Sequence, residues 1–249
     1  MGLSKLGALT EQRLLIFGGT GSIGVAIRQK FQGEGWKAVV VSRSELSGAS
    51  TVQWDPSALD ESEDSDHRSR AIRTLKELGP FDAVCWAQGV NCNDSVYDID
   101  IANHERVYRA NVIYVLGSLQ TLLRERLLRK PARLCVISSI WQKLARQSKL
   151  SYCISKAALQ GLILSAAADL ARDGHVINAV LPGVIDTPMT RKNLSEAQVR
   201  VVEESTLFGR LPTLEEVANT VFVLCKSDNT AITGQFISVD LGYSSVRVI

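Results

Sequence analysis

The sequence predicts an α/β fold, a doubly wound parallel sheet of about seven strands with helices on both faces. Two observations predict it. Short apolar runs of strand length alternate with helical patterns along the 249 residues, and a glycine-rich turn follows the first of these runs at once. A chain of this length is long enough to bury one large core, so we expect residues 1–249 to form a single domain.

The first strand is predicted at Arg13–Phe17, directly before the glycine-rich turn. Gly19, Gly21 and Gly24 have the G-x-G-x-x-G spacing, and a helical pattern follows them. Glycines let the backbone approach a pyrophosphate, and the helix N-terminus then offers its unpaired N–H groups to the charge. This order of strand, turn and helix is typical of a Rossmann-like dinucleotide site. Its expected contacts are Gly18, Gly19, Thr20, Gly21, Ser22, Ile23 and Gly24.

The second strand, Ala38–Val41, ends in Ser42 and Arg43. In dinucleotide-binding folds the end of this strand faces the adenosine ribose, where an acid binds a free 2′-hydroxyl and a cation binds a 2′-phosphate. No acid is present here, and a guanidinium offers phosphate a fixed fork of donors. The sequence therefore favours NADP over NAD, with Ser42 and Arg43 as contacts. An ordinary exposed arginine is the alternative.

The third and fourth strands supply further expected contacts with the cofactor. Val52–Pro56 ends in Asp55 and Pro56, which we expect beside the adenine. Phe81–Gly89 runs into small residues that let the backbone pass close to a cofactor. The helical pattern that follows includes Asn111. The contacts expected from the fourth strand are Ala87, Gln88 and Gly89.

The candidate catalytic residues follow the fifth strand, Leu134–Ile137, which presents Ser139 at its tip. Tyr152 and Lys156 are four residues apart at the start of a long apolar helix, so they share one face of it. A free phenol has a pKa of about 10, and a neighbouring cation lowers it. This predicts Tyr152 as a proton-transfer residue and Ser139 as a hydroxyl that orients a substrate oxygen. A surface tyrosine and lysine on an amphipathic helix is the alternative.

The remaining elements complete the alternation of strands and helices. A strand at Val176–Val180 breaks at Pro182, and the last helix and strand are predicted at Leu214–Cys225 and Phe236–Val239. The segment 189–210 is polar and weakly periodic. Such a segment is typical of a mobile lid that closes over a substrate and excludes water.

The composition argues against several other kinds of protein. The net charge is +2 without a long basic block, so we expect no nucleic-acid partner. The five cysteines contain no Cys-x-x-Cys pair, which favours a reducing cytoplasm over a disulfide framework. Residues 1–10 lack a continuous apolar run and no apolar stretch approaches about 18 residues, so we expect neither a signal peptide nor a membrane span. The scattered His67, His104 and His175 predict no metal site.

Taken in order, these residues and the Gly-Gln-x-x-x-Val-Asp motif at Gly234–Asp240 resemble the short-chain dehydrogenase/reductase family, and in particular its 3-oxoacyl reductases, over nearly the whole chain. The resemblance implies an NADP(H)-dependent oxidoreductase that reduces a ketone or aldehyde by hydride transfer, with Tyr152 as the proton donor. It implies that Ser139 holds the substrate oxygen, that Lys156 binds the nicotinamide ribose and that Asn111 holds a water that relays protons. The cofactor contacts that it adds are Tyr152, Lys156, Pro182, Gly183, Ile185 and Thr187.

The chain departs from the family pattern at three places. Phe17 precedes the first glycine where the family commonly has Thr, and Ser22 replaces a glycine. Trp86 begins the segment that is usually Asn-Asn-Ala-Gly, and Leu241 interrupts the usual Asp-Gly-Gly tail. None of these departures touches the candidate catalytic residues.

The apolar helix after Tyr152 also indicates assembly. Packing against the sheet uses one side of a helix, whereas apolar residues surround much of this one. The resemblance implies that the helix pairs with its copy in a homotetramer or homodimer. The residues concerned are Leu159, Leu162, Ile163, Leu164, Ala166, Ala167 and Ala168.

Two other functions remain open, an NAD-dependent dehydrogenase of a sugar-derived or polyol alcohol and a non-catalytic dinucleotide-binding scaffold. Substrate contacts are expected in the lid and in the loop that contains Trp141, Gln142 and Leu144. The basic residues near the predicted mouth either attract an anionic substrate or form a solvated rim. These residues are Lys143, Arg146, Lys149, Arg191 and Lys192.

Overall fold

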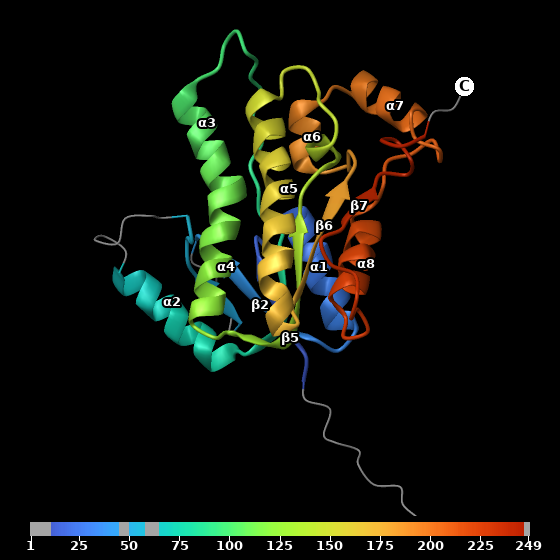
Figure 1. The fold of residues 1–249 in the computed structure, drawn as a ribbon. Helices are drawn as coiled ribbons and strands as arrows, with labels where there is room; N and C mark the ends of the chain where they lie inside the picture. Colours follow the sequence, from blue (N-terminus) through green and yellow to red (C-terminus); the bar gives the residue numbers. More distant parts are fainter. Residues whose placement is uncertain (1–10, 45–49, 58–64, 247–249) are drawn as a thin grey trace, which may run out of the picture.

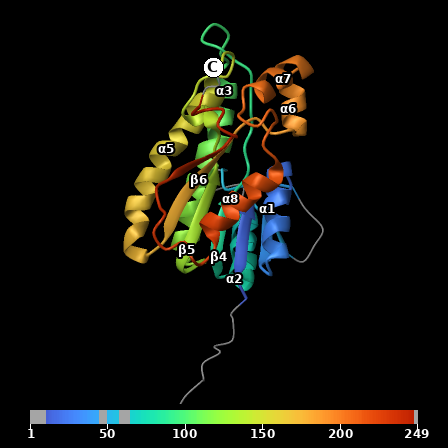
Figure 2. The same cartoon turned by 90° about the vertical axis from the view of Figure 1, so that its right-hand side faces the viewer.

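Parallel strands form one sheet of seven within the described residues, in the order β3-β2-β1-β4-β5-β6-β7 (Figure 1). The computed structural model describes residues 11–44, 50–57 and 65–246. Residues 1–10, on which the expectation of no signal peptide rests, lie outside them. Helices cover both faces of the sheet (Figure 2), so the predicted doubly wound parallel fold is confirmed. The strands are β1 Arg13–Phe17, β2 Lys37–Ser42, β3 Thr51–Gln53, β4 Phe81–Trp86, β5 Leu128–Ile137, β6 Val176–Pro182 and β7 Phe236–Val239.

The observed strands match the predicted ones at β1 and β7 and differ from them elsewhere for local reasons. β3 ends at Gln53 because the Asp55 carboxylate accepts hydrogen bonds from the N–H and the hydroxyl of Ser57, at 2.9 and 2.6 Å, and the chain turns there. β5 begins at Leu128, ahead of the predicted start, because its first residues pair with β4 before an irregularity in the register.

The helices include one turn that the sequence pattern did not predict. Asn111 lies in a π-helical turn, Arg109–Ile113, between two α-helices. Turns of this kind occur frequently at functional sites. The α-helices are α1 Ser22–Gly33, α2 Ser65–Leu78, α3 Ile101–Tyr108, α4 Tyr114–Arg124, α5 Leu150–Leu170, α6 Pro188–Asn193, α7 Glu196–Glu204 and α8 Leu214–Cys225, and the 3₁₀ turns are Ile140–Gln142 and Ala171–Asp173.

Side chains of the strands alternate between two cores, because successive residues of a strand point to opposite faces of the sheet. From β1, Leu15 and Phe17 belong to the core under α2, α4 and α5, whereas Leu14 and Ile16 belong to the core under α1 and α8. All four side chains are fully buried. The core under α1 and α8 also holds three free thiols, those of Cys85, Cys135 and Cys225.

An aromatic cluster explains two of the departures from the family pattern. Phe17 stacks on Trp86 with ring centroids 5.7 Å apart, and it also contacts the rings of Trp54 and Tyr114. The Trp86 indole N–H donates to the Ser118 hydroxyl at 2.7 Å, so its buried polar group is satisfied. Aromatic packing therefore holds the ends of β1 and β4 together where the family commonly uses amides.

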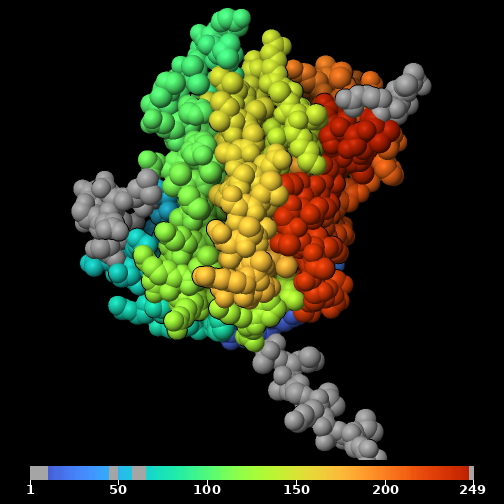
Figure 3. Space-filling view, in the orientation of Figure 1, coloured from blue at the N-terminus to red at the C-terminus, as the bar shows by residue number. Residues whose placement is uncertain are grey.

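Helix α5 runs the length of one face of the molecule, beside α4 (Figure 3). By length and composition alone, Leu150–Asp173 is long and apolar enough to cross a membrane, with a mean hydropathy of 1.3, a test that the core helices of soluble proteins also pass. Leu159 and Ile163 pack into the core, whereas Leu164 is 49% exposed. The helix therefore has an apolar side that the protomer leaves open.

The order of the strands locates the binding edge of the sheet. Successive strands are added outward from β1 to β3 on one side of the sheet and from β4 to β7 on the other. The strand order therefore reverses between β1 and β4. Ligands of open parallel sheets bind outside the carboxyl ends of the strands at such a point. Helices α6 and α7 stand beyond the same end of the sheet (Figure 2).

Candidate active site

A cavity of about 460 Å³ opens at the carboxyl ends of β1, β2 and β4. It brings together residues that are far apart in the sequence, as the switch in strand order requires. Most of the predicted cofactor contacts line it. They are Gly18, Thr20, Gly21, Ser22, Ile23, Ser42, Arg43, Ala87, Gln88, Gly89 and Thr187.

The turn after β1 needs its glycines at two positions for different reasons. Gly18 has a φ of +75°, the left-handed region that glycine adopts without strain. A Cβ on Gly24 would lie 2.2 Å from the carbonyl oxygen of Gly18, so the first turn of α1 packs directly against the loop. Gly18 therefore permits the turn itself, and Gly24 permits the close packing of α1 against it.

Two features of this cavity fit a dinucleotide. The residue before α1 is Gly21, which caps the helix with no side chain, so the N–H groups of the first turn are available to a pyrophosphate. The side-chain oxygen Oε1 of Gln88 is buried and has no hydrogen-bond partner among the described residues. A buried acceptor of this kind is costly unless a donor, such as a ribose hydroxyl, reaches it.

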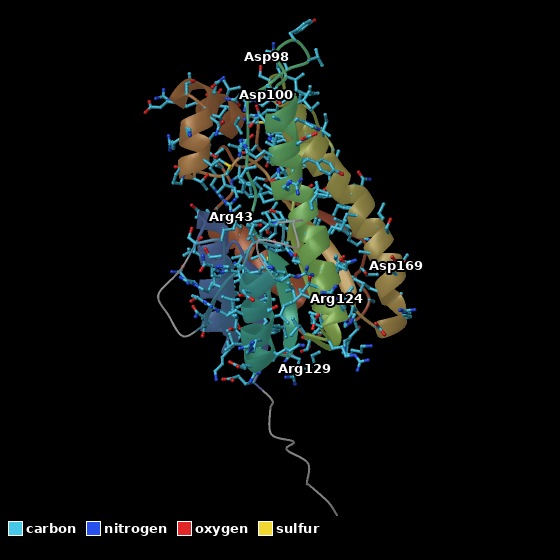
Figure 4. All side chains as sticks on the ribbon, turned by 90° about the vertical axis from the view of Figure 1, so that its left-hand side faces the viewer. Arg43, Asp98, Asp100, Arg124, Arg129 and Asp169 are labelled. Carbon is cyan, nitrogen blue, oxygen red and sulfur yellow. The ribbon has the colours of Figure 1, made fainter. Side chains whose placement is uncertain are left out.

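Arg43 lies at the end of β2, on the wall of the same cavity (Figure 4). Its side chain is exposed, and within the described residues its guanidinium forms no ion pair. Its backbone carbonyl accepts a hydrogen bond from the Gln53 side chain at 3.2 Å, which anchors the segment. A guanidinium held there suits the 2′-phosphate of an adenosine ribose.

A second, smaller groove of about 130 Å³ adjoins the cavity and shares Ile23, Thr187 and Met189 with it. Ser139 and Tyr152 both line this groove. The remaining predicted contacts with the nicotinamide end line it as well, namely Pro182, Gly183 and Ile185. Ser139 and Tyr152 therefore lie beside the part of the cavity that adjoins this groove.

Lys156 and Asn111 lie behind this groove rather than on its wall. The Lys156 ammonium is 5.7 Å from the centre of the Tyr152 ring and donates to the Ile137 carbonyl at 3.1 Å. The Asn111 amide donates to the Val90 carbonyl at 3.0 Å and accepts from the Val90 N–H at 2.8 Å. A Cβ on Gly89 would come within 3.3 Å of Asn111 Oδ1 and 3.6 Å of Lys156 Nζ, so the two polar groups flank one small residue.

The pKa of Tyr152 corrects a prediction made from the sequence. Burial raises the pKa of this phenol to about 12, and a hydrogen bond with the Ser139 side chain opposes that rise. The expected lowering by Lys156 is wrong for the protein without cofactor. Desolvation also lowers the pKa of Lys156 to about 8, which weakens its positive charge at mildly alkaline pH.

Besides Lys156, four predicted contacts with the cofactor are not on the wall of either cavity. Asp55 and Pro56 lie at the turn after β3, where Ser57 reaches the cavity instead. Gly19 and Gly24 lie inside the loop and act through its packing. The sequence pattern also missed three residues that line the cavity or the groove. Tyr114 lies on α4, outside the glycine loop and the strand ends, and Asn91 and Asn193 are isolated polar residues without a recognisable motif.

Replacing Lys156 by Met should stabilise the cofactor-free protein. In the fold this ammonium loses its proton near pH 8, against its ordinary value of 10.5. Below pH 8 the folded state carries the full cost of burying the charge, and above 10.5 both states are neutral and that cost is absent. We expect Lys156→Met to raise the free energy of unfolding by about 1–2 kcal/mol at pH 7, after the loss of its hydrogen bond.

Denaturant unfolding at several pH values checks this, and the gain should shrink as the pH rises from 8 to 10.5. Lys143→Met, at an exposed position, is the control and should leave the free energy of unfolding unchanged. A gain from Lys156→Met that does not vary with pH would contradict the assignment of the effect to the buried charge.

Comparison with known proteins agrees with this geometry. A family model described as enoyl-(acyl carrier protein) reductase matches residues 18–244. The 3-oxoacyl-(acyl-carrier-protein) reductase MabA of Mycobacterium tuberculosis is 29% identical over 235 residues, which cover 93% of this chain and 92% of that protein. A glucose 1-dehydrogenase of Gluconobacter oxydans is 26% identical over 242 residues, 93% of this chain and 91% of that protein.

Solved structures share the fold. The crystal structure of a gluconate 5-dehydrogenase from Burkholderia cenocepacia, in complex with NADP and tartrate, matches with a TM-score of 0.85. The match covers 94% of this chain and 96% of that one, at 22% sequence identity. At this identity the likeness extends to the architecture alone.

Proposed function

The chain belongs to the short-chain dehydrogenase/reductase family, and from this premise we propose that it is an NADP(H)-dependent oxidoreductase that reduces a ketone or aldehyde. One observation carries the proposal. Ser139 and Tyr152 face a groove that opens into the glycine-lined cavity next to Arg43. A carbonyl in that groove would meet two hydroxyls on one side and the cofactor on the other.

Each residue has a distinct part in the proposed reaction. Ser139 donates a hydrogen bond to the carbonyl oxygen and holds it beside Tyr152. Tyr152, protonated at neutral pH because burial raises its pKa, donates its proton to that oxygen as negative charge develops there. Lys156 would hold the nicotinamide ribose, and Asn111 would hold a water through which Tyr152 regains a proton from solvent. When bound, the reduced cofactor supplies the hydride.

Arg43→Ala is the test of the proposed cofactor. We expect the dissociation constant for NADPH to rise about 10- to 100-fold, because a charge-assisted contact with the 2′-phosphate is lost. The dissociation constant for NADH should stay unchanged. Titrations followed by nicotinamide fluorescence measure both values, and Arg124→Ala, at the end of α4 and well separated from Arg43 in Figure 4, is the control. Equal losses for the two cofactors would argue against NADP.

A second candidate is an NAD-dependent dehydrogenase that oxidises a sugar-derived or polyol alcohol. The similarity to a glucose 1-dehydrogenase favours it. Wild-type protein that prefers NADH, and an Arg43→Ala variant without effect, would support this function. A non-catalytic scaffold is a third reading, which cofactor binding without turnover of any carbonyl or alcohol would support.

The groove continues into a larger cleft, of about 800 Å³, between α7 and the loop after Ser139. Mostly apolar side chains line this cleft, and we propose that it takes the body of the substrate. The segment 189–210, which contains α6 and α7, would then act as the lid. The cleft contains Trp141, Leu144, Val184, Leu194, Val201 and Val202.

We further propose that the protein is cytoplasmic and assembles through α5 as a homotetramer or homodimer. The free thiols of its five cysteines support the location. The exposed apolar side chains Ile154 and Leu164 support the interface, since an open apolar helix face is typical of a contact between subunits. Sedimentation as a monomer at micromolar concentration would contradict the assembly.

A further inference from the structure

Lys149 is a buried cation in the catalytic groove. It precedes α5 by one residue and Tyr152 by three, and only 3% of its surface is exposed. It lines the same groove as Ser139 and Tyr152. The alternative of a solvated rim is therefore wrong for this residue. A buried ammonium is rare in proteins unless it is paired or functional.

The partners of Lys149 are all uncharged. Its ammonium donates to Asn91 Oδ1 at 2.9 Å, to the Cys92 carbonyl at 3.2 Å and to Asn193 Oδ1 at 3.3 Å. The nearby Asp94 carboxylate is bound to the N–H and the hydroxyl of Ser151. Within the described residues, no carboxylate lies within hydrogen-bond distance of Lys149.

Arg146 is a second cation on this groove, and it also lines the apolar cleft. It is half-buried, and among the described residues no hydrogen bond or ion pair engages its guanidinium. Desolvation, followed by the charge of Arg146, lowers the pKa of Lys149, and the charge of Asp94 partly opposes this. Two like charges held together in a partly dry groove destabilise the empty protein, and an anion between them would relieve that cost.

The other basic residues near the mouth behave differently. Arg191 is exposed and pairs with Asp186 at 2.6 Å. Lys143 is exposed and its ammonium is 3.5 Å from the Phe236 carbonyl, and Lys192 is exposed. These three residues therefore fit the alternative of a solvated rim. Only Lys149 and Arg146 among the five basic residues line the groove.

We propose that Lys149 and Arg146 form an oxyanion subsite, so that the substrate is a ketone with a carboxylate or similar oxyanion near its reacting carbon. The inference rests on the proposed function, which puts the carbonyl between Ser139 and Tyr152. The oxyanion replaces the Asn193 side chain, the longest of the three contacts of Lys149. Because Asn193 ends α6, binding of the substrate would move a residue of the predicted lid.

Matched substrates test the subsite. The 2-, 3- and 4-oxo derivatives of pentanoic acid are compared with their methyl esters, which keep the ketone and remove the charge. We expect the wild type to prefer at least one acid over its ester in kcat/KM. Lys149→Met and Arg146→Gln should each lower kcat/KM for that acid about tenfold or more, and for its ester less than about threefold. Lys143→Gln, on the exposed rim, is the control and should change neither.

The outcomes separate an anion subsite from a structural role. A wild type without preference for any acid, or equal losses for acid and ester in both variants, would overturn the proposal. If Lys149→Met does not fold, Arg146→Gln carries the test, because no hydrogen bond or ion pair among the described residues engages its guanidinium.

A binding measurement keeps the subsite separate from the proposed function. Butyrate cannot be reduced, and its binding is measured by calorimetry with and without NADPH. Binding to the wild type that is weakened at least about tenfold in Arg146→Gln supports the subsite even if no ketone is turned over. If the esters are reduced and butyrate does not bind, the proposed reductase activity is supported and the proposed subsite is overturned.

Discussion

Tyr152→Phe is expected to lower kcat about 10²- to 10⁴-fold, the range that general acid catalysis contributes. The change removes one hydroxyl and keeps the ring that packs beside the Lys156 ammonium, so the groove retains its shape. The dissociation constant for NADPH should therefore change less than about threefold. Steady-state kinetics with any ketone that the wild type reduces, together with a fluorescence titration of NADPH, measure the two quantities.

Tyr114→Phe is the matched control. Tyr114 is a buried phenol on the wall of the glycine-lined cavity and not on the groove that contains Ser139, and burial raises its pKa strongly. Its loss should leave kcat within a few-fold of the wild type. Full turnover in Tyr152→Phe would remove this residue from the mechanism, whereas joint loss of turnover and cofactor binding would indicate a structural role.

Gly24→Ala has the second of the large expected effects, a loss of NADPH affinity of about 100-fold or more. The new Cβ would lie 2.2 Å from the Gly18 carbonyl oxygen and 2.8 Å from Gly19 Cα. Both are backbone atoms, so no side-chain movement relieves the clash. Either the glycine turn or α1 must shift, which we expect to cost about 1–3 kcal/mol of stability as well.

Gly33→Ala separates the clash from the effects of any added methyl group. Gly33 ends the same helix, and a Cβ there meets nothing within 4 Å. In a helix the exchange of glycine for alanine stabilises by about 0.5–1 kcal/mol, so this variant should bind NADPH normally and unfold at a slightly higher temperature. Normal NADPH binding by Gly24→Ala would contradict this prediction, because it would show that the glycine turn can shift without loss of the cofactor site.

The main features of the fold were predictable because local signals and the fold agree. An apolar run followed at once by glycines predicted β1 and the start of α1, and Leu214–Cys225 begins with a capping box that makes the boundary of α8 clear. The π-helical turn at Asn111 was not predictable, since a helical pattern cannot distinguish one extra residue in a turn.

The candidate site was predictable in its residue types and less so in its electrostatics. Spacing predicted that Ser139 and Tyr152 meet, and both line the groove. The pKa of Tyr152 depends on how much water surrounds the phenol, which only the packed structure reveals. For the same reason Lys149 appeared equivalent to Arg191, although one ammonium is buried and the other cation is exposed.

The five cysteines divide into two chemical classes. The thiols of Cys85, Cys135 and Cys225 are buried between the sheet and the helices α1 and α8, whereas Cys92 and Cys153 are partly accessible near the groove. Alkylation requires an accessible thiolate. Labelling of the two partly accessible thiols therefore reports reaction of the folded protein, while labelling of the three buried ones follows opening of the core. The rates of the two classes thus distinguish the folded state from openings of the core between the sheet and the helices α1 and α8.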